Sequence, residues 1–456
     1  MRTKFLVVLA FIFCLSSNAQ TKTWSLQECV DYAIENNITV KQSELDTEIA
    51  QENIVSAKGN FLPTVNGSTS GSFNFGSFIG QDGSRVSFDS FGNSLGLNAG
   101  VSLFNGYRNT NLYKQAQLGL ESSELQLQKL KDDISLFVVN TYLNVLLNKE
   151  NLKIADEQIK ISQKQVEQIQ ELVDAGVRAK TDLYDIQAQL ASDQERVVNA
   201  QNSIDLALLN LAQLLQVSHK GFDVETVELD LPAVALLYND ADEIFNRAVS
   251  ARPEIRSAEL AIENSELDIE IAKSAFYPSV SLGGGVSTSY QHTLGEKDRR
   301  TVVDPITGEV TSVANGFGQQ FSDNLGYNIG VSVSIPIFNG GRTKSNVNRA
   351  TLNNERIAYG LEQAKQDLRS TIEQAYADAK ATLNQFEASQ ASVIAQEEAF
   401  RTAQESYDLG VMTSFEFEQV RNRLINAQAS LATAKYNFVF KSKLLEFYYG
   451  IPITID

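Results

Sequence analysis

The residue types that most often carry catalysis are scarce in this chain. His219 and His292 are its two histidines, both in segments predicted to be loops, and neither has a nucleophile or further metal ligands at a useful spacing. The glycine run 283–285 lies inside an alternating pattern and lacks the Lys-Ser or Lys-Thr pair that follows a phosphate-binding loop. The sequence therefore predicts a protein that is not an enzyme, with no catalytic residue, cofactor or metal site.

Carboxylates placed shortly after two repeated turn phrases are candidates for chemistry of another kind. The phrases have the pattern Asp-x-Gly-Val at 174–177 and 408–411, and Asp182 and Glu416 each follow the glycine by six residues. Carboxylates held close together repel one another and attract cations. An acidic residue in the first turn of a helix is also favoured by the helix dipole, so capping remains an alternative for each of them.

The two turn phrases belong to an internal duplication. Phrases ending in Phe-Asn-Gly occur at 103–106 and 337–340, and the differences 338 − 104 and 410 − 176 both equal 234. An earlier pair of phrases, at 57–63 and 272–278, differs by 215, from 278 − 63. The offset thus grows by 19 residues, from 234 − 215, between the prolines and the Phe-Asn-Gly phrases. Two units of one plan are predicted, with the additional residues in a loop at about 291–320.

Apolar and small polar residues alternate in the segments before these phrases. The alternation is clear at 93–104, 279–291 and 322–337 and weaker at 64–79. Period two over about ten residues suits a tilted transmembrane strand, although a half-buried soluble sheet gives the same pattern. The polar face carries Gly, Ser and Asn with almost no charge, where a strand facing water would usually carry Lys, Glu or Thr. This composition favours transmembrane strands.

Long segments with helical periodicity follow the strands. Between 108 and 173 there is no proline, and apolar residues recur at intervals of three and four with one four-four step, which is a heptad stripe with a single stutter. At 1.5 Å per residue such a helix spans roughly 100 Å. A cytosolic coiled-coil rod is the alternative for this pattern alone, but a rod does not explain the strands. The other predicted helices lie at 342–407, 182–216, 416–448, 25–59 and 241–274.

The N-terminal residues predict export from the cytoplasm. Arg2 and Lys4 precede an apolar run that is too short to span a bilayer, and small residues follow at 17–19, so residues 1–19 are predicted to be a signal peptide. Cys29 is then the one cysteine of the mature chain, which excludes an intrachain disulfide. We expect Cys29 to be a small buried hydrophobic residue in the first helix.

Charge and hydropathy narrow the possible environments of the mature protein. The formal charge of −18 becomes about −20 without Arg2 and Lys4, which argues against nucleic acid as a partner. After the signal peptide, no stretch approaches the 18 unbroken apolar residues of a transmembrane helix. Transmembrane strands, which hide their apolar band in alternation, remain possible.

The order helix, strand, strand, long helix, Asp-x-Gly-Val turn and long helix, present twice behind a signal peptide, resembles the TolC-type outer-membrane efflux proteins over essentially the whole mature chain. The resemblance implies a mainly α fold with transmembrane β. In it, three chains form a twelve-stranded β-barrel, four strands from each, continued by an α-helical barrel across the Gram-negative periplasm. Residues 20–216 would form the first repeat, 217–240 a linker near the middle of the tube, and 241–456 the second repeat. A homotrimer also satisfies a physical requirement, because four strands cannot close a pore and an open sheet edge cannot face lipid.

The same resemblance implies a function and a set of partners. The function is a passive exit duct in the outer membrane, serving a tripartite efflux or type I secretion system. The partners are a periplasmic adaptor (membrane fusion) protein, an inner-membrane pump of the RND or ABC type, and outer-membrane lipid. The alternative is a secreted coiled-coil adhesin or an envelope spacer without a through-pore. Discrete conductance in a planar bilayer separates these two functions.

The turns and the helix starts beyond them acquire roles by resemblance. The turns would form the periplasmic tip that docks the adaptor, and the acidic residues would approach the axis at the narrowest point of the tube. Tyr407 and Asp182 match positions that hold the tip closed in the family, whereas Met412 departs from the pattern where a basic residue would strengthen that latch; Arg178 occupies the equivalent place in the first half. A left-handed C-cap alone could also explain the glycines. The docking residues are Gly176, Val177, Gly410 and Val411, and the gate residues are Asp182, Asp185, Tyr407, Glu416 and Glu418.

Prolines and aromatic residues mark the borders between strands and helices. Pro63, Pro278 and Pro336 fix φ and end helical hydrogen bonding there, either as a barrel-helix junction or as simple punctuation. Aromatic side chains would form a girdle at each membrane interface, although core packing could explain each one singly. The girdles are Phe61, Phe104, Phe276, Tyr277 and Phe338 on the periplasmic side, and Phe75, Phe78, Phe88, Phe91 and Phe321 on the outer side.

Overall fold

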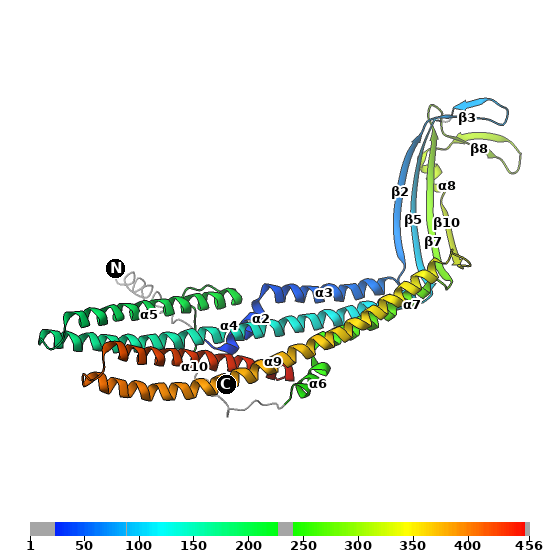
Figure 1. Ribbon diagram of the computed structural model, residues 1–456. Helices are drawn as coiled ribbons and strands as arrows, with labels where there is room; N and C mark the ends of the chain where they lie inside the picture. The colour runs from blue at the N-terminus through cyan, green and yellow to red at the C-terminus, as the bar shows by residue number, and fades with distance from the viewer. Residues whose placement is uncertain (1–22, 88, 227–239, 452–456) are drawn as a thin grey trace, which may run out of the picture. The chain divides into compact units, whose positions relative to one another are not determined.

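The computed structural model describes residues 23–87, 89–226 and 240–451 (Figure 1). The predicted signal peptide, most of the predicted linker at 217–240, Phe88 and the side chain of Phe78 therefore lie outside the described residues.

Two compact units make up the described chain. The first combines the N-terminal residues up to Thr47 with Ser123–Glu259 and the residues from Tyr359 onward. The second combines Glu48–Ser122 with Leu260–Ala358. Each unit thus draws segments from both sequence repeats, so the compact units and the repeats are different divisions of the chain.

The helices repeat at the two offsets found in the sequence. At an offset of 215, from 241 − 26, α2 (Leu26–Asn36) matches α6 (Ala241–Ala251) and α3 (Ile38–Gly59) matches α7 (Pro253–Ser274). At an offset of 234, from 342 − 108, α4 (Arg108–Asp174) matches α9 (Arg342–Asp408) and α5 (Lys180–Leu215) matches α10 (Ser414–Tyr449). Each pair has equal length. None of the described helices contains an apolar stretch of the length that spanning a bilayer requires.

The prediction of one helix at 25–59 and another at 241–274 is wrong, because each segment is broken into two helices. Asn37 is extended (φ −62°, ψ 127°), and its Oδ1 accepts a hydrogen bond from the backbone N of Thr39 at 2.8 Å, which starts α3. In the second repeat the break falls at Arg252, also extended, directly before Pro253. Proline disfavours the α conformation in the residue before it and suits the first position of a helix.

A four-stranded antiparallel sheet lies in the second unit, with the strand order β10-β7-β5-β2 (Figure 1). The pairing of β5 with β7 joins the two repeats, and β2 and β10 are the edges. None of the four strands contains Asp, Glu, Lys or Arg. They are β2 (Thr64–Asn74), β5 (Ser90–Asn105), β7 (Ser279–Thr293) and β10 (Gly326–Ser334).

The two faces of this sheet differ in polarity. Leu97 pairs with Val286, which pairs in turn with Tyr327, so these three side chains form one row on the same face. The neighbouring row, of Asn98, Gly285 and Asn328, lies on the opposite face. In the single chain the apolar face is uncovered, and Tyr327 is 87% exposed. An exposed apolar face on strands without charge is what contact with lipid requires.

Two of the predicted strands are shorter than expected. The strand predicted at 64–79 ends at Asn74, and β3 (Ser77–Ile79) instead pairs with β4 (Arg85–Ser87) in a hairpin that turns at Gly83, whose φ is +80°. The strand predicted at 322–337 begins at Gly326 and ends at Ser334, just before Pro336, which has no N–H to donate to a ladder.

The region predicted as a loop at 291–320 has regular structure of its own. It contains the hairpin of β8 (Arg299–Val303) and β9 (Val310–Ala314) and most of α8 (Phe317–Asp323). The backbone N of Gln291 donates to Gln320 Oε1 at 2.9 Å, and Gln320 Nε2 donates to the carbonyl O of Gln291 at 2.9 Å. This amide bridge holds α8 against the end of β7.

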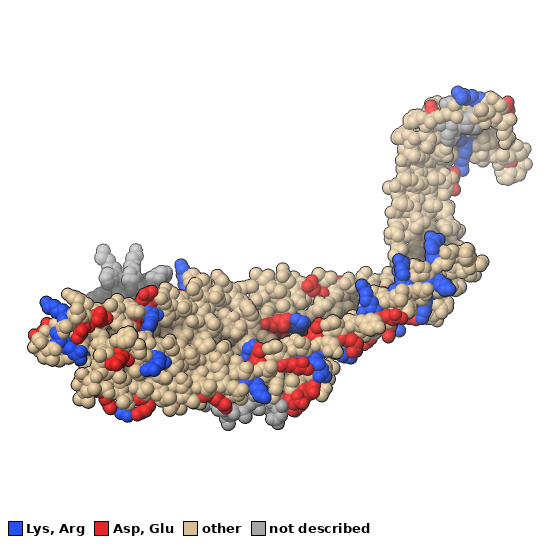
Figure 2. Space-filling view, viewed as in Figure 1, with Lys and Arg blue, Asp and Glu red and all other residues tan. Residues whose placement is uncertain are grey.

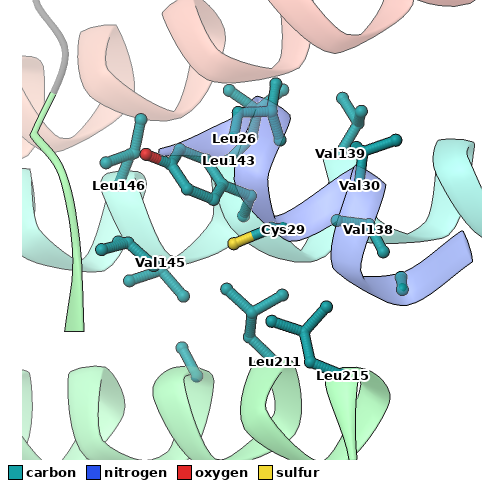
Figure 3. Close-up of a cluster of buried hydrophobic side chains, with 14 of the residues drawn as sticks. Leu26, Cys29, Val30, Val138, Val139, Leu143, Val145, Leu146, Leu211 and Leu215 are labelled. Atoms are coloured by element: carbon teal, nitrogen blue, oxygen red, sulfur yellow. The ribbon is translucent and has the colours of Figure 1, made fainter. Parts of the chain in front are cut away.

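The largest apolar cluster of the first unit lies where α2 packs on α4 and α5 (Figure 3). Cys29 is fully buried there and forms no disulfide with another described residue, which confirms the expectation for this residue. Tyr142 adds a polar tie: its hydroxyl donates to the carbonyl O of Glu225 at 2.8 Å, beside the short parallel pair of β1 (Thr23–Trp24) and β6 (Asp223–Val224). Burial raises the pKa of Tyr142, so this hydroxyl remains a donor.

Candidate functional site

Each pair of long helices reverses at a glycine with a left-handed backbone. At the end of α4, Gly176 has φ +77°, its N–H donates to the carbonyl O of Val173 at 3.0 Å, and the N–H of Val177 donates to the carbonyl O of Leu172 at 2.8 Å. These two bonds form a Schellman motif, which satisfies carbonyl groups left open at a helix end.

The second turn repeats the first bond for bond. At the end of α9, Gly410 has φ +72°, and its N–H donates to the carbonyl O of Tyr407 at 2.9 Å. The N–H of Val411 donates to the carbonyl O of Ser406 at 3.0 Å. A Cβ added to either glycine would meet nothing within 4 Å. The turns therefore favour glycine for its φ, and the space around them is open.

Apolar side chains stand exposed at both turns. Val177 is 69% exposed, Val411 81% and Phe415 72%. Leu409 beside Gly410 is also exposed. Neighbouring exposed apolar residues on a water-facing segment are a feature of protein contact surfaces.

The four helices that end in these turns enclose an apolar cluster, and Tyr407 belongs to it. Tyr407 is buried, its ring stacks on Phe417 with centroids 4.8 Å apart, and its hydroxyl lies 3.4 Å from Ser414 Oγ. The buried members are Ile169, Leu183, Ile186, Ala403, Tyr407, Phe417 and Val420. In the single chain Tyr407 thus packs in the core of the helix tips.

Three of the four predicted gate carboxylates lie at the surface or partly exposed. Asp182 Oδ2 pairs with Arg178 Nη1 at 3.5 Å. Asp185 is exposed, and the structure gives it no hydrogen bond or ion pair with another described residue. Glu416 closes a capping box: its Oε2 accepts from the N and the Oγ1 of Thr413 at 3.0 and 2.8 Å, which lowers the pKa of Glu416.

Glu418 points instead toward a buried polar cluster between the helices. Its Oε2 lies 3.0 Å from Arg421 Nε. The guanidinium of Arg421 is fully buried and donates to Asp193 at 2.8 Å and to Ser162 at 2.5 Å, and the Ser162 hydroxyl donates to Asp193 as well. This cluster, which we call the Arg421 cluster, joins α4, α5 and α10.

The Arg421 cluster was not predicted from the sequence, although a signal for it exists. Arg421 lies between Phe417, Val420 and Leu424 on the buried stripe of α10. At the offset of 234, Arg421 corresponds to Gln187 (421 − 234) and Asp193 to Ala427 (193 + 234). A charged residue on an apolar stripe that its repeat does not share indicates a buried partner on another helix.

Replacing Glu418 by Gln is expected to preserve or raise thermal stability at neutral pH. Burial raises the pKa of Glu418 above its usual value of 4.5. A carboxyl whose pKa is raised by folding contributes stability at low pH that is lost as the pH rises through the folded-state pKa. Glu418→Gln should therefore reduce the loss of stability between acid and neutral pH, by no more than about 1 kcal/mol. Thermal melting of the detergent-extracted protein from pH 4 to 8 measures this change.

Glu416→Gln is the matched control, because the pKa of Glu416 is lowered. Its contribution is present above the unfolded pKa and is lost as the pH falls through the folded pKa. The control should therefore melt earlier than wild type at neutral pH and equally at acid pH. If both variants move in the same direction at neutral pH, the assignment of Glu418 to the buried cluster is wrong.

Aromatic rings occupy both ends of the sheet, and prolines mark the end next to the helices. Strands β2 and β7 begin directly after Pro63 and Pro278. At this end Phe61, Phe276, Tyr277 and Phe338 are exposed, and Phe104 stands edge-on to Tyr107. At the opposite end Phe75 is exposed, Phe91 lies against Phe73, and Phe321 stacks on Phe317.

The chain matches known proteins over most of its length. The family model for outer membrane efflux proteins matches residues 29–216 and 244–450. Outer membrane protein TolC of Escherichia coli K12 is 22% identical over 441 residues, which covers 96% of this chain and 84% of the relative. The cation efflux system protein CusC of Escherichia coli O157:H7 is 24% identical, covering 74% of this chain and 66% of the relative.

Solved structures match at the level of the fold. A crystal structure of CusC superimposes with a TM-score of 0.75 at 21% identity and covers 96% of both chains. The outer membrane protein VceC of Vibrio cholerae gives a TM-score of 0.73 at 18% identity, covering 94% of this chain and 97% of that one. With the family model matched in both repeats, the conclusion is that this chain belongs to the outer membrane efflux protein family.

Proposed function

We propose that this protein is a passive exit duct in the outer membrane of a Gram-negative cell, working in a tripartite efflux or type I secretion system. The proposal rests on one observation: the same chain combines an uncharged sheet with long helical hairpins. A sheet without a single charged residue, and with an uncovered apolar face, is continuous in sequence with two helical hairpins whose long helices have 67 residues each. The uncharged sheet with its apolar face is suited to contact with lipid, and the long helical hairpins are suited to extend into the periplasm.

Assembly into a homotrimer completes the duct. The edge strands β2 and β10 have unpaired backbone groups along one side in the single chain. In lipid such groups need partners, and pairing between chains supplies them when the sheets close into a barrel. Three chains would contribute twelve strands, and the helical hairpins would line the continuation of the tube.

The relatives support a duct whose cargo is set elsewhere. Among them are a cation efflux system protein, an alkaline protease secretion protein and a pyoverdine export protein. Because these names cover cations, a protease and pyoverdine, we infer that the pump and the adaptor choose the cargo of this chain too. The partners would be a periplasmic adaptor at the turns of Gly176 and Gly410 and an inner-membrane pump of the RND or ABC type.

Reconstitution of the mature protein in a planar bilayer tests the duct. We expect discrete single-channel steps, and a mass of three chains by light scattering after subtraction of detergent. A secreted adhesin or an envelope spacer would give neither. A stable monomer with the β-signal intact by circular dichroism, or a trimer without conductance, would refute the proposed duct.

The carboxylates beside the turns are expected to make the open channel cation-selective and sensitive to multivalent cations. Asp182, Asp185 and Glu416 from three chains would crowd the entrance, while Glu418 is held by the Arg421 cluster. Like charges about 6 Å apart repel by roughly 0.7 to 3 kcal/mol per pair, so one trivalent cation can satisfy several carboxylates. The triple variant Asp182→Asn, Asp185→Asn, Glu416→Gln should weaken periplasmic block by a trivalent cation about tenfold or more.

A matched variant separates local from overall charge in this test. Asp46, Glu48 and Glu52 are exposed carboxylates on α3, and their neutralisation changes the net charge by the same amount. Block should be unchanged in that variant. Equal block in the entrance variant and wild type would show that these carboxylates are ordinary helix-start residues.

A further inference from the structure

Basic residues recur where the long helices leave the sheet. Lys58 in the last turn of α3 and Lys273 in the last turn of α7 are related by the offset of 215 (273 − 58). Arg108 and Arg342 are the first residues of α4 and α9, and Lys344 follows. All five are exposed and lie in the second compact unit. Figure 2 shows Lys and Arg gathered at this border, next to strands that are almost free of charge in this view.

Four of these residues have no acidic partner among the residues that the structure describes. Lys273 is the exception, because its Nζ pairs with Glu270 at 2.7 Å. The Nζ of Lys58 lies 5.7 Å from the ring centroid of Tyr113, a contact that leaves its charge unneutralised. We call the four residues Lys58, Arg108, Arg342 and Lys344 the basic collar.

The acidic residues closest to the sheet are already engaged. Glu270 pairs with Lys273, and Asp268 Oδ1 accepts a hydrogen bond from Gln115 Nε2 at 2.7 Å. Lys114 is not counted in the basic collar, since it lines a groove between α4 and α7 together with Glu263, Glu266 and Glu270. The basic collar is therefore exposed, and its charge has no acidic partner within residues 23–87, 89–226 and 240–451.

The opposite end of the same sheet has the reverse balance. The connection 75–89 carries two acidic residues and one basic residue, and 294–325 carries five acidic residues and three basic ones. Several of these form pairs, such as Arg300 with Asp323 at 2.6 Å. The chain as a whole has a formal charge of −18, so the positive charge of the basic collar is a local exception. An anionic surface next to this end of the sheet would explain why these residues are basic.

Aromatic residues locate the basic collar relative to the membrane. Phe61, Phe276, Tyr277 and Phe338 are exposed at the same end of the sheet. Aromatic rings are enriched at the level of lipid headgroups, and Lys and Arg near them reach the charged layer. Between this end and the other, the strands contain no charged residue, as the hydrocarbon layer requires.

We propose that the basic collar binds anionic phospholipid headgroups of the leaflet on the helix side of the sheet. The proposal rests on the proposed function, because it requires the sheet to lie in a membrane. A Lys or Arg close to an anionic lipid surface is attracted to it, and the attraction falls off within a Debye length. In a homotrimer twelve such side chains would encircle the barrel and fix its depth in the bilayer.

Spin-labelled lipids test this preference directly. The mature protein is reconstituted in phosphatidylcholine vesicles with a trace of spin-labelled phosphatidylglycerol or phosphatidylcholine, and electron paramagnetic resonance gives the fraction of each label held at the protein surface. Wild type should select phosphatidylglycerol roughly threefold. The preference should vanish in 1 M NaCl, where the Debye length is about 3 Å. It should also vanish in the variant Lys58→Gln, Arg108→Gln, Arg342→Gln, Lys344→Gln.

The chain offers a matched control at the other end of the sheet. Arg85 lies in β4, Lys297 in the connection from β7 to β8, and Arg299 and Arg300 in β8. Their change to Gln removes the same charge, and this variant should keep the preference. Equal selectivity in the collar variant and wild type, or equal loss in both variants, overturns the proposal. Loss of the preference in sodium phosphate but not in sodium chloride of the same ionic strength would assign the residues to a free anion instead.

The two proposals fail in different ways. If neither labelled lipid shows an immobilised fraction, the protein is not in the bilayer, and the proposed duct falls together with the basic collar. If both lipids are immobilised to the same extent, the protein is inserted and the basic collar alone is wrong.

Discussion

A strain that carries Gly176→Asp together with Gly410→Asp is expected to lose export completely, while the trimer still forms and inserts. Both glycines have a left-handed backbone, which costs another residue roughly 1 kcal/mol, and open space surrounds them. The fold should tolerate that cost. The new carboxylates, however, would stand among the exposed side chains of Val177, Val411 and Phe415, where an apolar partner surface would have to desolvate them.

Two further variants isolate the cause of the loss. Gly176→Ala with Gly410→Ala imposes the same backbone strain without charge, and most export should remain. Gly83→Asp with Gly308→Asp adds the same charge and strain at other glycines with positive φ and open space, in the hairpins of the second unit. Export of a known cargo, measured at equal protein abundance, decides the matter. Normal export in the variant Gly176→Asp with Gly410→Asp would show that the turns do not dock the adaptor.

Much of the fold can be predicted from the sequence, because in a long helix or strand the same periodic pattern of apolar residues recurs many times. The helix predicted at 108–173 differs from α4 by one residue, since no proline or strand pattern competes over that length. The duplication is equally robust, because each helix pair preserves its offset. Short interruptions are harder. The break at Asn37 depends on one side-chain hydrogen bond, although Pro253 did signal the equivalent break at Arg252.

In the candidate site too, features that depend on local sequence could be predicted, and features that depend on packing between helices could not. The φ of Gly176 and Gly410 follows from a glycine placed where a long helix must end, which is local information. The positions of Tyr407 and Glu418 depend on how four helices pack, and heptad spacing does not give the rotation of one helix against another. Tyr407 therefore lies in an apolar cluster, and Glu418 turns toward Arg421. Pairing of β5 with β7 across the two repeats is likewise a long-range feature that alternation cannot reveal.

Arg421→Met is expected to destabilise the helical part of the molecule by about 3 kcal/mol or more, the usual cost of removing one partner from a buried ion pair. Asp193 is fully buried and would keep its bonds to Ser162 and Gln189 and a longer contact with Arg196 at 3.4 Å. None of these replaces the ion pair of Asp193 with Arg421 Nη2, and Ser162 also loses the bond that Arg421 Nη1 donates to it. Arg423→Met, on an exposed neighbour in α10, should change stability by no more than about 0.5 kcal/mol.

A double variant separates the pair from the packing around it. In Arg421→Met with Asp193→Leu the unpaired charge of Asp193 is gone, whereas Glu418 lacks Arg421 in both variants and cancels from the comparison. Apolar residues that replace a buried ion pair are often neutral or stabilising. The double variant should therefore melt at a higher temperature than Arg421→Met alone, although it carries one more substitution. Melting temperatures are compared by circular dichroism at one scan rate, because a large assembly often unfolds irreversibly and its apparent melting temperature then depends on the scan rate. If the loss of stability in the double variant equals the sum of the losses in Arg421→Met and in Asp193→Leu, then Arg421 and Asp193 are energetically independent. The Arg421 cluster then does not hold α5 and α10 together.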